Sequence, residues 1–272
     1  MKKRLFGLLL LFLLIALPFA VPLAESKGEV LVVSGKHLPI RIFDGQRYLS
    51  LYALCLALGE GEATPVAKES ICLAVNTPQL EATIQDGSHL VVANGRYLYS
   101  DYANIYRDKV LYVPFASAVK AVGGQITHRE GNYFYLETNE QAAIAKGEDY
   151  YAEDKVLWLS RIIHAESGNQ PLAGKIAVGT VVMNRVDHPD YPDTIYGVIF
   201  DKKYGVQFTP TENGTIWCEP GEESIVAAKI VLEGYRTDPN ILFFMNEDIA
   251  ASTWISDNCD YAFTIEDHSF WS

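Results

Sequence analysis

The sequence predicts an α+β protein in which a small α/β domain built from two repeats precedes a larger, mostly helical domain. Two observations lead to this prediction. An internal repeat occupies the first half of the 272-residue chain, and amphipathic helical segments follow it. A chain of this length can form two modest domains preceded by an export segment.

The first 24 residues have the pattern of an export segment. Three basic residues at positions 2–4 precede an uncharged apolar run over residues 5–24, which is typical of a signal peptide or of an uncleaved N-terminal membrane anchor. Cleavage after Ala20 or Ala24 would leave a proline at the third position back, where a small residue is preferred. Both alternatives stay open, and the rest of the chain is expected outside the cytoplasm.

Four cysteines lie in the part of the chain that follows this segment. Cys55, Cys72, Cys218 and Cys259 fit neither zinc-finger nor C-x-x-C spacing. In an oxidising compartment they can pair, and the bonds Cys55–Cys72 and Cys218–Cys259 would each stay inside one predicted domain. Four buried thiols are the alternative.

The net charge of −12 is unevenly distributed, with −1 over residues 1–149 and −11 over residues 150–272. A surface that binds nucleic acid needs clustered lysine and arginine side chains. Nucleic acid is therefore excluded as a partner, and an acidic surface is also not attracted to anionic lipid. An uncharged glycan is compatible with this charge.

The repeat consists of residues 42–59 and residues 105–123, which begin 63 residues apart. Each copy has the pattern of a turn, a short strand and an amphipathic helix that ends at a glycine. Segments 81–84 and 133–137 have the alternation expected of strands.

The region 28–138 resembles the two-copy module called the copper amine oxidase N-terminal-like domain, which implies a stalk or wall-binding spacer. Its histidines, His37, His89 and His128, are scattered singly. We therefore predict no metal site and no cofactor in this half of the chain.

The second half is predicted to begin after a polar, Ala- and Gly-containing linker at residues 139–151. Helices are predicted at 156–168, 171–185 and 222–233, a long functional loop at 188–220, and a short buried strand at 241–245. Small residues in the second of these helices would allow a neighbouring helix to approach closely.

Glu166 is the first candidate for a chemical role because it continues an apolar stripe. Val156, Leu159 and Ile163 are spaced three and four apart, and Glu166 follows three residues later, just before the helix stop at Gly168. A carboxyl group there is partly desolvated and near the negative end of the helix dipole, and both effects raise its pKa. Such a group can hold a proton near neutral pH and donate it. The alternative is a glutamate at a frayed helix end that points into solvent.

Spacing excludes several known catalytic motifs. His164-Ala165-Glu166 matches the H-x-E half of a zinc deaminase motif, but no P-C-x-x-C follows. The chain has no H-E-x-x-H, G-x-S-x-G, P-loop or dinucleotide fingerprint. A nucleophile formed by Cys218 or Cys259 with His268 is disfavoured, because an exported location favours disulfides over thiolates. We expect His268 to have a packing role.

The surroundings of Glu166 resemble a known family. The run Ile163-His164-Ala165-Glu166-Ser167-Gly168-Asn169-Gln170-Pro171, continuing to Val186, is similar to the signature of the SleB/CwlJ-like spore cortex-lytic cell wall hydrolases. Further motifs follow in the family's order at 191–200, 207–208, 243–246 and 268–270. The resemblance spans 152–272 and implies a lysozyme-like catalytic domain, with the family's catalytic glutamate at Glu166.

The resemblance also implies the substrate and the place of action. The expected partner is the glycan strand of peptidoglycan, in spore cortex lysis during germination or in wall remodelling. The protein would be secreted to the cell wall or spore cortex, or anchored there by its N-terminus, and would act alone or with an accessory germination protein. No cofactor is implied.

The implied reaction is that of a lytic transglycosylase. Glu166 would protonate the glycosidic oxygen between N-acetylmuramic acid and N-acetylglucosamine, and then deprotonate the C6 hydroxyl of the muramoyl sugar to close a 1,6-anhydro ring. Many family members carry a second glutamate four residues later; here that position is Gln170, whose amide is not a base but can hydrogen-bond substrate. This favours the anhydro route over hydrolysis, which uses a second carboxylate. Asp187, Asp190 and Glu212 are either that carboxylate or ordinary loop acids.

Five further residues are candidates for contact with sugar. Asn184 and Asn246 would bond acetamido groups, and Tyr204 and Phe208 would stack on sugar faces; turn capping and core packing are the alternatives. Arg185 either braces the helix that carries Glu166 or contacts a glycan carboxylate. The rival to an enzyme is a non-catalytic, wall-binding or structural protein whose domain only holds glycan.

Overall fold

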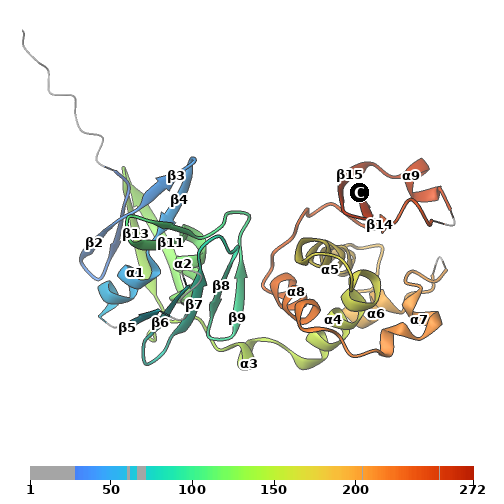
Figure 1. Cartoon of the computed structure of the whole chain (residues 1–272), viewed down its shortest axis with the longest axis horizontal. Helices are drawn as coiled ribbons and strands as arrows, with labels where there is room; N and C mark the ends of the chain where they lie inside the picture. The colour runs from blue at the N-terminus through green and yellow to red at the C-terminus, as the bar shows by residue number, and fades with distance from the viewer. Residues whose placement is uncertain (1–27, 60–61, 66–71, 204, 251) are drawn as a thin grey trace, which may run out of the picture.

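The computed structural model describes residues 28–59, 62–65, 72–203, 205–250 and 252–272. The predicted export segment at 1–24 and the predicted sugar-stacking residue Tyr204 lie outside the described residues. Strands dominate residues 28–151, called here the N-terminal half, and helices dominate residues 152–272, called the C-terminal half (Figure 1). The mixed α+β class is thus confirmed. Two separate hydrophobic cores form, one from Leu31 to Ile144 and the other from Leu159 to Phe270.

The described residues of the N-terminal half form three sheets. Their orders are β12-β13-β1-β2, β10-β11-β4-β3 and the meander β5-β6-β7-β8-β9. The strands are β1 (Val30–Val33), β2 (Lys36–Pro39), β3 (Arg41–Phe43), β4 (Gln46–Leu49), β5 (Glu62–Pro65), β6 (Cys72–Asn76), β7 (Glu81–Gln85), β8 (Leu90–Ala93), β9 (Arg96–Tyr99), β10 (Ile105–Arg107), β11 (Val110–Pro114), β12 (Gly124–Glu130) and β13 (Tyr133–Thr138). The first and last strands, β1 and β13, pair in parallel and close this half.

The two repeat copies adopt matching structures, as predicted. A hairpin leads into helix α1 (Leu51–Leu58) in the first copy and into α2 (Phe115–Ala121) in the second. The equivalent strands β4 and β11 pair antiparallel with each other. Gly59 ends α1 in the left-handed conformation, with φ at 107°, and its N–H bonds the carbonyl of Leu56.

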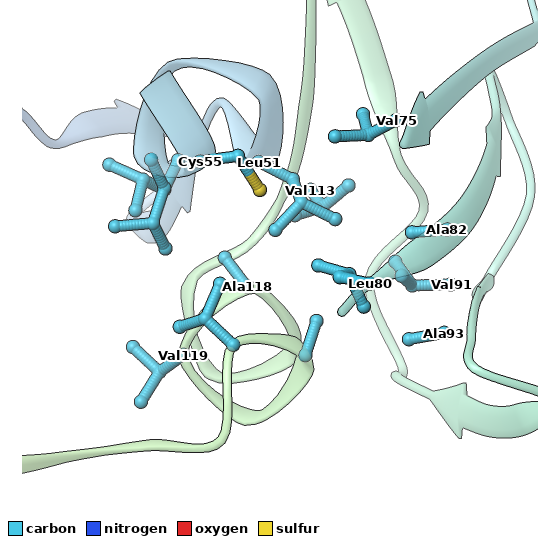
Figure 2. Packing of buried hydrophobic residues seen from close by; sticks show 14 of the residues in the cluster. Leu51, Cys55, Val75, Leu80, Ala82, Val91, Ala93, Val113, Ala118 and Val119 are labelled. Atoms are coloured by element: carbon cyan, nitrogen blue, oxygen red, sulfur yellow. The ribbon is translucent and has the colours of Figure 1, made fainter. Parts of the chain in front are cut away.

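The core of this half is formed between the two repeat helices and the five-stranded sheet. Figure 2 shows Leu51 and Cys55 on α1 and Ala118 and Val119 on α2, with side chains from β6 to β8 on the other side. The structure has no disulfide in its described part. Cys55 is buried in this core and Cys218 is exposed at the surface of the other half, so the alternative of four buried thiols is wrong for Cys218.

The predicted linker at 139–151 is part of the folded protein. Ala143 and Ile144 are buried in the first core, and a short helix, α3 (Gly147–Tyr150), follows. A Cβ on Gly147 would lie 2.6 Å from the carbonyl oxygen of Gly95, so only glycine allows this approach. The polar composition predicted a linker between the two domains, whereas Ala143 and Ile144 pack this segment into the first core.

The C-terminal half is built on three helices that pack together: α4 (Glu153–Ser167), α5 (Leu172–Asp187) and α8 (Glu222–Leu232). All three were predicted. A Cβ on Gly179 of α5 would lie 2.8 Å from Ile163 on α4 and 3.1 Å from Val231 on α8. The small residues of α5 therefore allow the close approach that the sequence indicated.

The remaining elements of this half surround these helices. The predicted loop at 188–220 contains α6 (Ile195–Ile199), α7 (Pro210–Asn213) and a 3-10 turn (Thr215–Trp217), so it is more regular than its Pro- and Gly-rich composition suggested. A three-stranded sheet has the order β14-β16-β15, from β14 (Phe243–Met245), β15 (Tyr261–Ile265) and β16 (His268–Trp271), with α9 (Trp254–Asn258) before β15. The predicted strand at 241–245 corresponds to β14.

A buried ionic cluster joins the two halves where β9 meets the end of α8 (Figure 1). Arg96 donates two hydrogen bonds of 2.7 Å to the Glu233 carboxylate. Lys120 lies 2.9 Å from the same carboxylate, and the Tyr151 hydroxyl donates to it over 2.7 Å. These four residues are called the interdomain cluster below. Within the described ranges, no helix has the length and apolarity needed to cross a membrane.

Candidate active site

A cavity of about 1280 Å³ opens beside Glu166. Its walls are the C-terminal ends of α4 and α5, the segment 206–209, β14, α9 and the turn between β15 and β16. Elements separated by up to 100 residues therefore meet here. We call it the Glu166 cavity.

Glu166 lies in the last turn of α4, as the periodicity predicted. The helix ends at Ser167, and the close approach of position 168 to the turn before it requires glycine, because a Cβ there would lie 2.6 Å from the carbonyl oxygen of His164. No described residue forms a hydrogen bond or a short ion pair with the Glu166 carboxylate. Burial raises the pKa of Glu166 to about 7, against the opposing charge of Arg185. The carboxyl group therefore carries a proton in a large fraction of molecules at neutral pH.

Arg185, which is 5 % exposed, is the residue whose positive charge lowers the pKa of Glu166. Its Nε donates to the carbonyl of Leu242 over 2.8 Å. The guanidinium also lies 5.2 Å from the ring centroids of Tyr191 and Phe208. Arg185 thus holds the chain leading into β14 against its own helix α5, and not the helix α4 that carries Glu166, as the bracing prediction had it; its charge lies beside the cavity.

The turn between β15 and β16 places Asp267 and His268 in the wall of the cavity. Gln170, 4 % exposed, donates from Nε2 to Oδ2 of Asp267 over 3.1 Å. His268 is 8 % exposed, and burial lowers its pKa, so its imidazole is neutral at pH 7. The His268 ring packs edge-on against Phe244, with centroids 5.5 Å apart, as expected, but it also lines the cavity.

Two predicted sugar contacts are corrected by the structure. Asn184 does not line the cavity, because its Nδ2 donates to the carbonyls of Asp238 and Ile241 over 2.9 and 2.8 Å. Its role is to hold the loop after α8 onto α5. Phe208 lines the cavity, but it is 2 % exposed and packs against Arg185, so it adopts the core-packing alternative.

Asn246 lines the cavity, as predicted, and is half-buried. Its Oδ1 accepts from the backbone N–H of Asp248 over 3.1 Å, which fixes the side chain at the end of β14.

The sequence offered Asp187, Asp190 and Glu212 as a second carboxylate beside Glu166, and of these three only Asp190 lines the cavity. Asp187 pairs with Arg236 over 3.4 Å and Glu212 is exposed on α7. Asp267 also lines the cavity, although no sequence pattern singled it out. Its position next to His268, in the last motif of the resemblance, was the available clue.

An aromatic wall also escaped prediction. Trp254, which is 55 % exposed, lines the cavity with Tyr191 and Phe243, and its ring centroid lies 6.0 Å from that of Phe243. Exposed aromatic rings of this kind are suited to stacking on sugar faces. Among the described residues, no group of three or more histidine, cysteine, aspartate or glutamate side chains is placed to hold a metal ion.

The C-terminal half is similar to known proteins. Residues 169–271 match the family model described as Cell Wall Hydrolase. The spore cortex-lytic enzymes of Oceanobacillus iheyensis and Bacillus cereus are each 31% identical over 105 residues, which is 39% of this chain and 37% and 39% of those proteins. The chain thus spans less than two fifths of the relatives' length.

Two solved structures are also similar. The catalytic domain of the germination-specific lytic transglycosylase SleB from Bacillus anthracis is 29% identical and covers 47% of this chain and 100% of that chain, with a TM-score of 0.41. The catalytic domain of the Bacillus cereus SleB protein is 30% identical and covers 45% and 92%, also with a TM-score of 0.41.

The matched segment makes residues 169–271 a cell wall hydrolase domain of the SleB type. The family model begins three residues after Glu166 and includes no part of the N-terminal half. The importance of Glu166 therefore rests on its position in the cavity and on its pKa.

Proposed function

We propose that this protein is an exported enzyme that cleaves the glycan strands of peptidoglycan between N-acetylmuramic acid and N-acetylglucosamine, with Glu166 as the acid. One observation carries the proposal: a half-buried carboxyl group without a hydrogen-bonding partner among the described residues opens onto a cavity of about 1280 Å³ in a cell wall hydrolase domain. A glutamate with a pKa of about 7 can supply a proton to a leaving oxygen at neutral pH.

The shape and chemistry of the cavity support a glycan as substrate. Trp254 and Tyr191 offer aromatic surface, while Asn246 and Gln170 offer amide groups. The C-terminal half carries most of the negative charge, which disfavours a polyanion and is compatible with a neutral sugar chain.

The proposed reaction uses Glu166 twice. The protonated carboxyl group donates to the glycosidic oxygen as the bond breaks through an oxocarbenium-like state. The resulting carboxylate then takes the proton from the C6 hydroxyl of the same muramoyl sugar, whose oxygen attacks C1 and closes the 1,6-anhydro ring. The charge of Arg185 lowers the pKa of Glu166 toward neutral pH, so that the carboxyl group can both lose and regain its proton during the reaction.

Hydrolysis is the alternative outcome, because Asp190 and Asp267 line the same cavity. A second carboxylate can activate water in an inverting hydrolase or act as the nucleophile in a retaining one.

The biological setting completes the proposal. We assign the protein to spore cortex lysis in germination or to wall remodelling, acting alone or with an accessory germination protein. The catalytic half is proposed to be lysozyme-like. The N-terminal half is proposed to be a copper amine oxidase N-terminal-like spacer held rigidly by the interdomain cluster, and the segment 1–24 is proposed to export or anchor the chain.

The test is mass spectrometry of the fragments that the protein releases from purified cell wall and spore cortex. We expect anhydromuramoyl ends from the unaltered protein and at least about a hundredfold less release from Glu166→Gln, since loss of a general acid costs about 10²–10⁴ in rate. Glu212→Gln, the same change on exposed α7, is the control and should release fragments normally.

Each outcome has a distinct meaning. Reducing ends would assign hydrolysis and make Asp267 and Asp190 the next residues to change. Binding to the wall without release by the unaltered protein would contradict an enzyme and support the wall-binding alternative. Release by Glu166→Gln at the normal rate would remove Glu166 from the mechanism.

A further inference from the structure

A cluster of aromatic rings lies at the surface where α6 packs against α4 (Figure 1). Trp158 on α4 is its centre. The ring centroid of Trp158 lies 5.0 Å from that of Tyr196 on α6, 5.5 Å from Phe200 at the end of α6, and 5.6 Å from Trp217 in the 3-10 turn. Tyr196 is 52 % exposed and Trp217 is 58 % exposed. Contiguous exposed apolar surface of this kind marks an interaction site in a soluble protein.

Arg161 adds a positive charge to these rings. Its guanidinium lies 5.6 Å from the ring centroid of Trp158 and 6.0 Å from that of Trp217, within reach of a cation–π attraction. Its ion-pair partner Glu219 lies 3.3 Å away and is 85 % exposed, so water weakens the pair. The four rings and Arg161 are called the aromatic patch below.

The aromatic patch and the Glu166 cavity are different surfaces. None of the five side chains of the patch lines the cavity. Arg161 precedes Glu166 by five residues on the same helix, so the two side chains point about 140° apart around the helix axis. A ligand in the cavity therefore leaves the patch open to a second ligand.

The exposed rings have polar edges as well as apolar faces. Among the described residues, none forms a hydrogen bond with the hydroxyl group of Tyr196 or the indole N–H of Trp217. A sugar ring has the complementary groups, because its C–H face is apolar and its hydroxyl groups form hydrogen bonds at the edges. The peptides of peptidoglycan also carry carboxylate groups, which match the guanidinium of Arg161.

The charge of the C-terminal half narrows the choice of ligand. Residues 150–272 carry a net charge of −11, which repels polyanions and anionic lipid surfaces. A glycan with scattered carboxylates is compatible with this charge. We propose that the aromatic patch is a second, non-catalytic binding site for the glycan strands of peptidoglycan, which holds the enzyme on the insoluble polymer while the Glu166 cavity cleaves it. This inference rests on the proposed function, because it takes the cleaved polymer as the ligand.

Sedimentation with purified, intact peptidoglycan measures the proposed binding. The full-length chain carries Glu166→Gln, so that the polymer stays uncut, and is compared with the same chain carrying Tyr196→Ala and Trp217→Ala in addition. We expect these two changes to weaken binding by about tenfold, the loss expected when exposed aromatic anchors are removed. Tyr106→Ala, at a tyrosine of the N-terminal half that is 40 % exposed, is the matched control and should leave binding unchanged.

Cleavage assays separate loss of binding from loss of folding. In protein that keeps Glu166, the double variant Tyr196→Ala/Trp217→Ala should raise the KM for intact peptidoglycan by about tenfold and leave kcat unchanged, because the patch only binds the polymer. Soluble tetrasaccharide fragments of the same polymer occupy the cavity alone. Their cleavage should be the same in the double variant as in the unaltered protein.

The outcomes separate this inference from the proposed function. Equal binding of intact peptidoglycan with and without Tyr196→Ala/Trp217→Ala would overturn the second site. A dimer in light scattering that becomes a monomer in the double variant would also overturn it, because the patch would then be an interface between two copies. If the unaltered protein cleaves peptidoglycan but the double variant loses no binding, only the second site fails. Patch-dependent binding by a protein that cleaves nothing would support the second site and contradict the proposed enzyme.

Discussion

Two glutamates at the ends of neighbouring helices differ in the direction in which their pKa values are shifted. Glu166 ends α4 and Glu233 follows α8. Burial is the largest influence on both and acts to raise both pKa values. The pKa of Glu166 rises to about 7, whereas the pKa of Glu233 falls below its usual range.

The difference lies in their partners. Arg96, Lys120 and Tyr151 all hydrogen-bond the Glu233 carboxylate and together outweigh its burial. Glu166 receives only the charge of Arg185, which forms no hydrogen bond with it. The protein therefore uses one buried glutamate as a fixed anion that joins its halves and keeps the other ready to exchange a proton.

Removal of the Glu233 charge should have the greatest effect on stability. Glu233→Gln leaves the Arg96 guanidinium, whose side chain is 8 % exposed, without its counter-ion. We expect a loss of about 3–5 kcal/mol in the free energy of unfolding, measured in urea at pH 7. Glu166→Gln is the matched control and should show no loss. A loss below about 1 kcal/mol in Glu233→Gln would mean that the interdomain cluster does not stabilise the protein.

The two glutamates should also change stability with pH in opposite directions. Because the folded-state pKa of Glu166 is raised from 4.5 to about 7, the folded protein binds more protons than the unfolded chain between these values. Stability is therefore lost as pH rises through this window, by at most about 3 kcal/mol. The lowered pKa of Glu233 gives the reverse: its contribution is present above pH 4.5 and is lost as pH falls below it.

Urea unfolding at pH 5 and pH 8 isolates the Glu166 part of this effect. Glu166→Gln should be about as stable as the unaltered protein at pH 5 and more stable at pH 8. Equal stability of the two proteins at both pH values would contradict the raised pKa.

A smaller effect is expected from Arg185, the one charge that opposes the burial of Glu166. Arg185→Met should raise the pKa of Glu166 further, so that the basic limb of the pH profile of kcat/KM moves up by about one pH unit. Arg185→Lys keeps a positive charge and should move the limb less. A limb that stays in place in Arg185→Met would show that this guanidinium does not act on Glu166.

The weakest effect should come from Lys120, the exposed member of the interdomain cluster. Its side chain is 44 % exposed, and an ion pair of that exposure contributes about 0–1 kcal/mol. Lys120→Ala should therefore destabilise the protein far less than Glu233→Gln in the same urea titration. A comparable loss would mean that Lys120, rather than Arg96, is the main partner of Glu233.

The same pair of glutamates shows what the sequence could predict. Glu166 was identified because one helix carries both the apolar stripe and the acid, so local periodicity was enough. Glu233 was not, because its partners Arg96 and Tyr151 lie 137 and 82 residues away and only the packing of two halves brings them together. The helices and repeat strands were likewise predicted from local patterns. Asp267 was missed because it lies 97 residues from its partner Gln170, and only packing brings the two together.

The position of a residue within a motif also did not predict the direction of its side chain. Asn184 and Phe208 lie within the predicted motifs, yet Asn184 is hydrogen-bonded to the loop after α8, and Phe208, although it lines the cavity, is 2 % exposed and packs against Arg185. A sequence pattern places a residue near a site, whereas burial and hydrogen bonding decide whether it faces the ligand.

The most direct test is a carboxyl titration of both glutamates in one sample. Carbon-13 NMR of protein labelled at the glutamate carboxyl carbon, with Glu166→Gln and Glu233→Gln to assign the two signals, gives each pKa. We predict a midpoint near pH 7 for Glu166 and one below 4.5 for Glu233. A Glu166 midpoint at or below 4.5 would contradict its role as a proton donor at neutral pH.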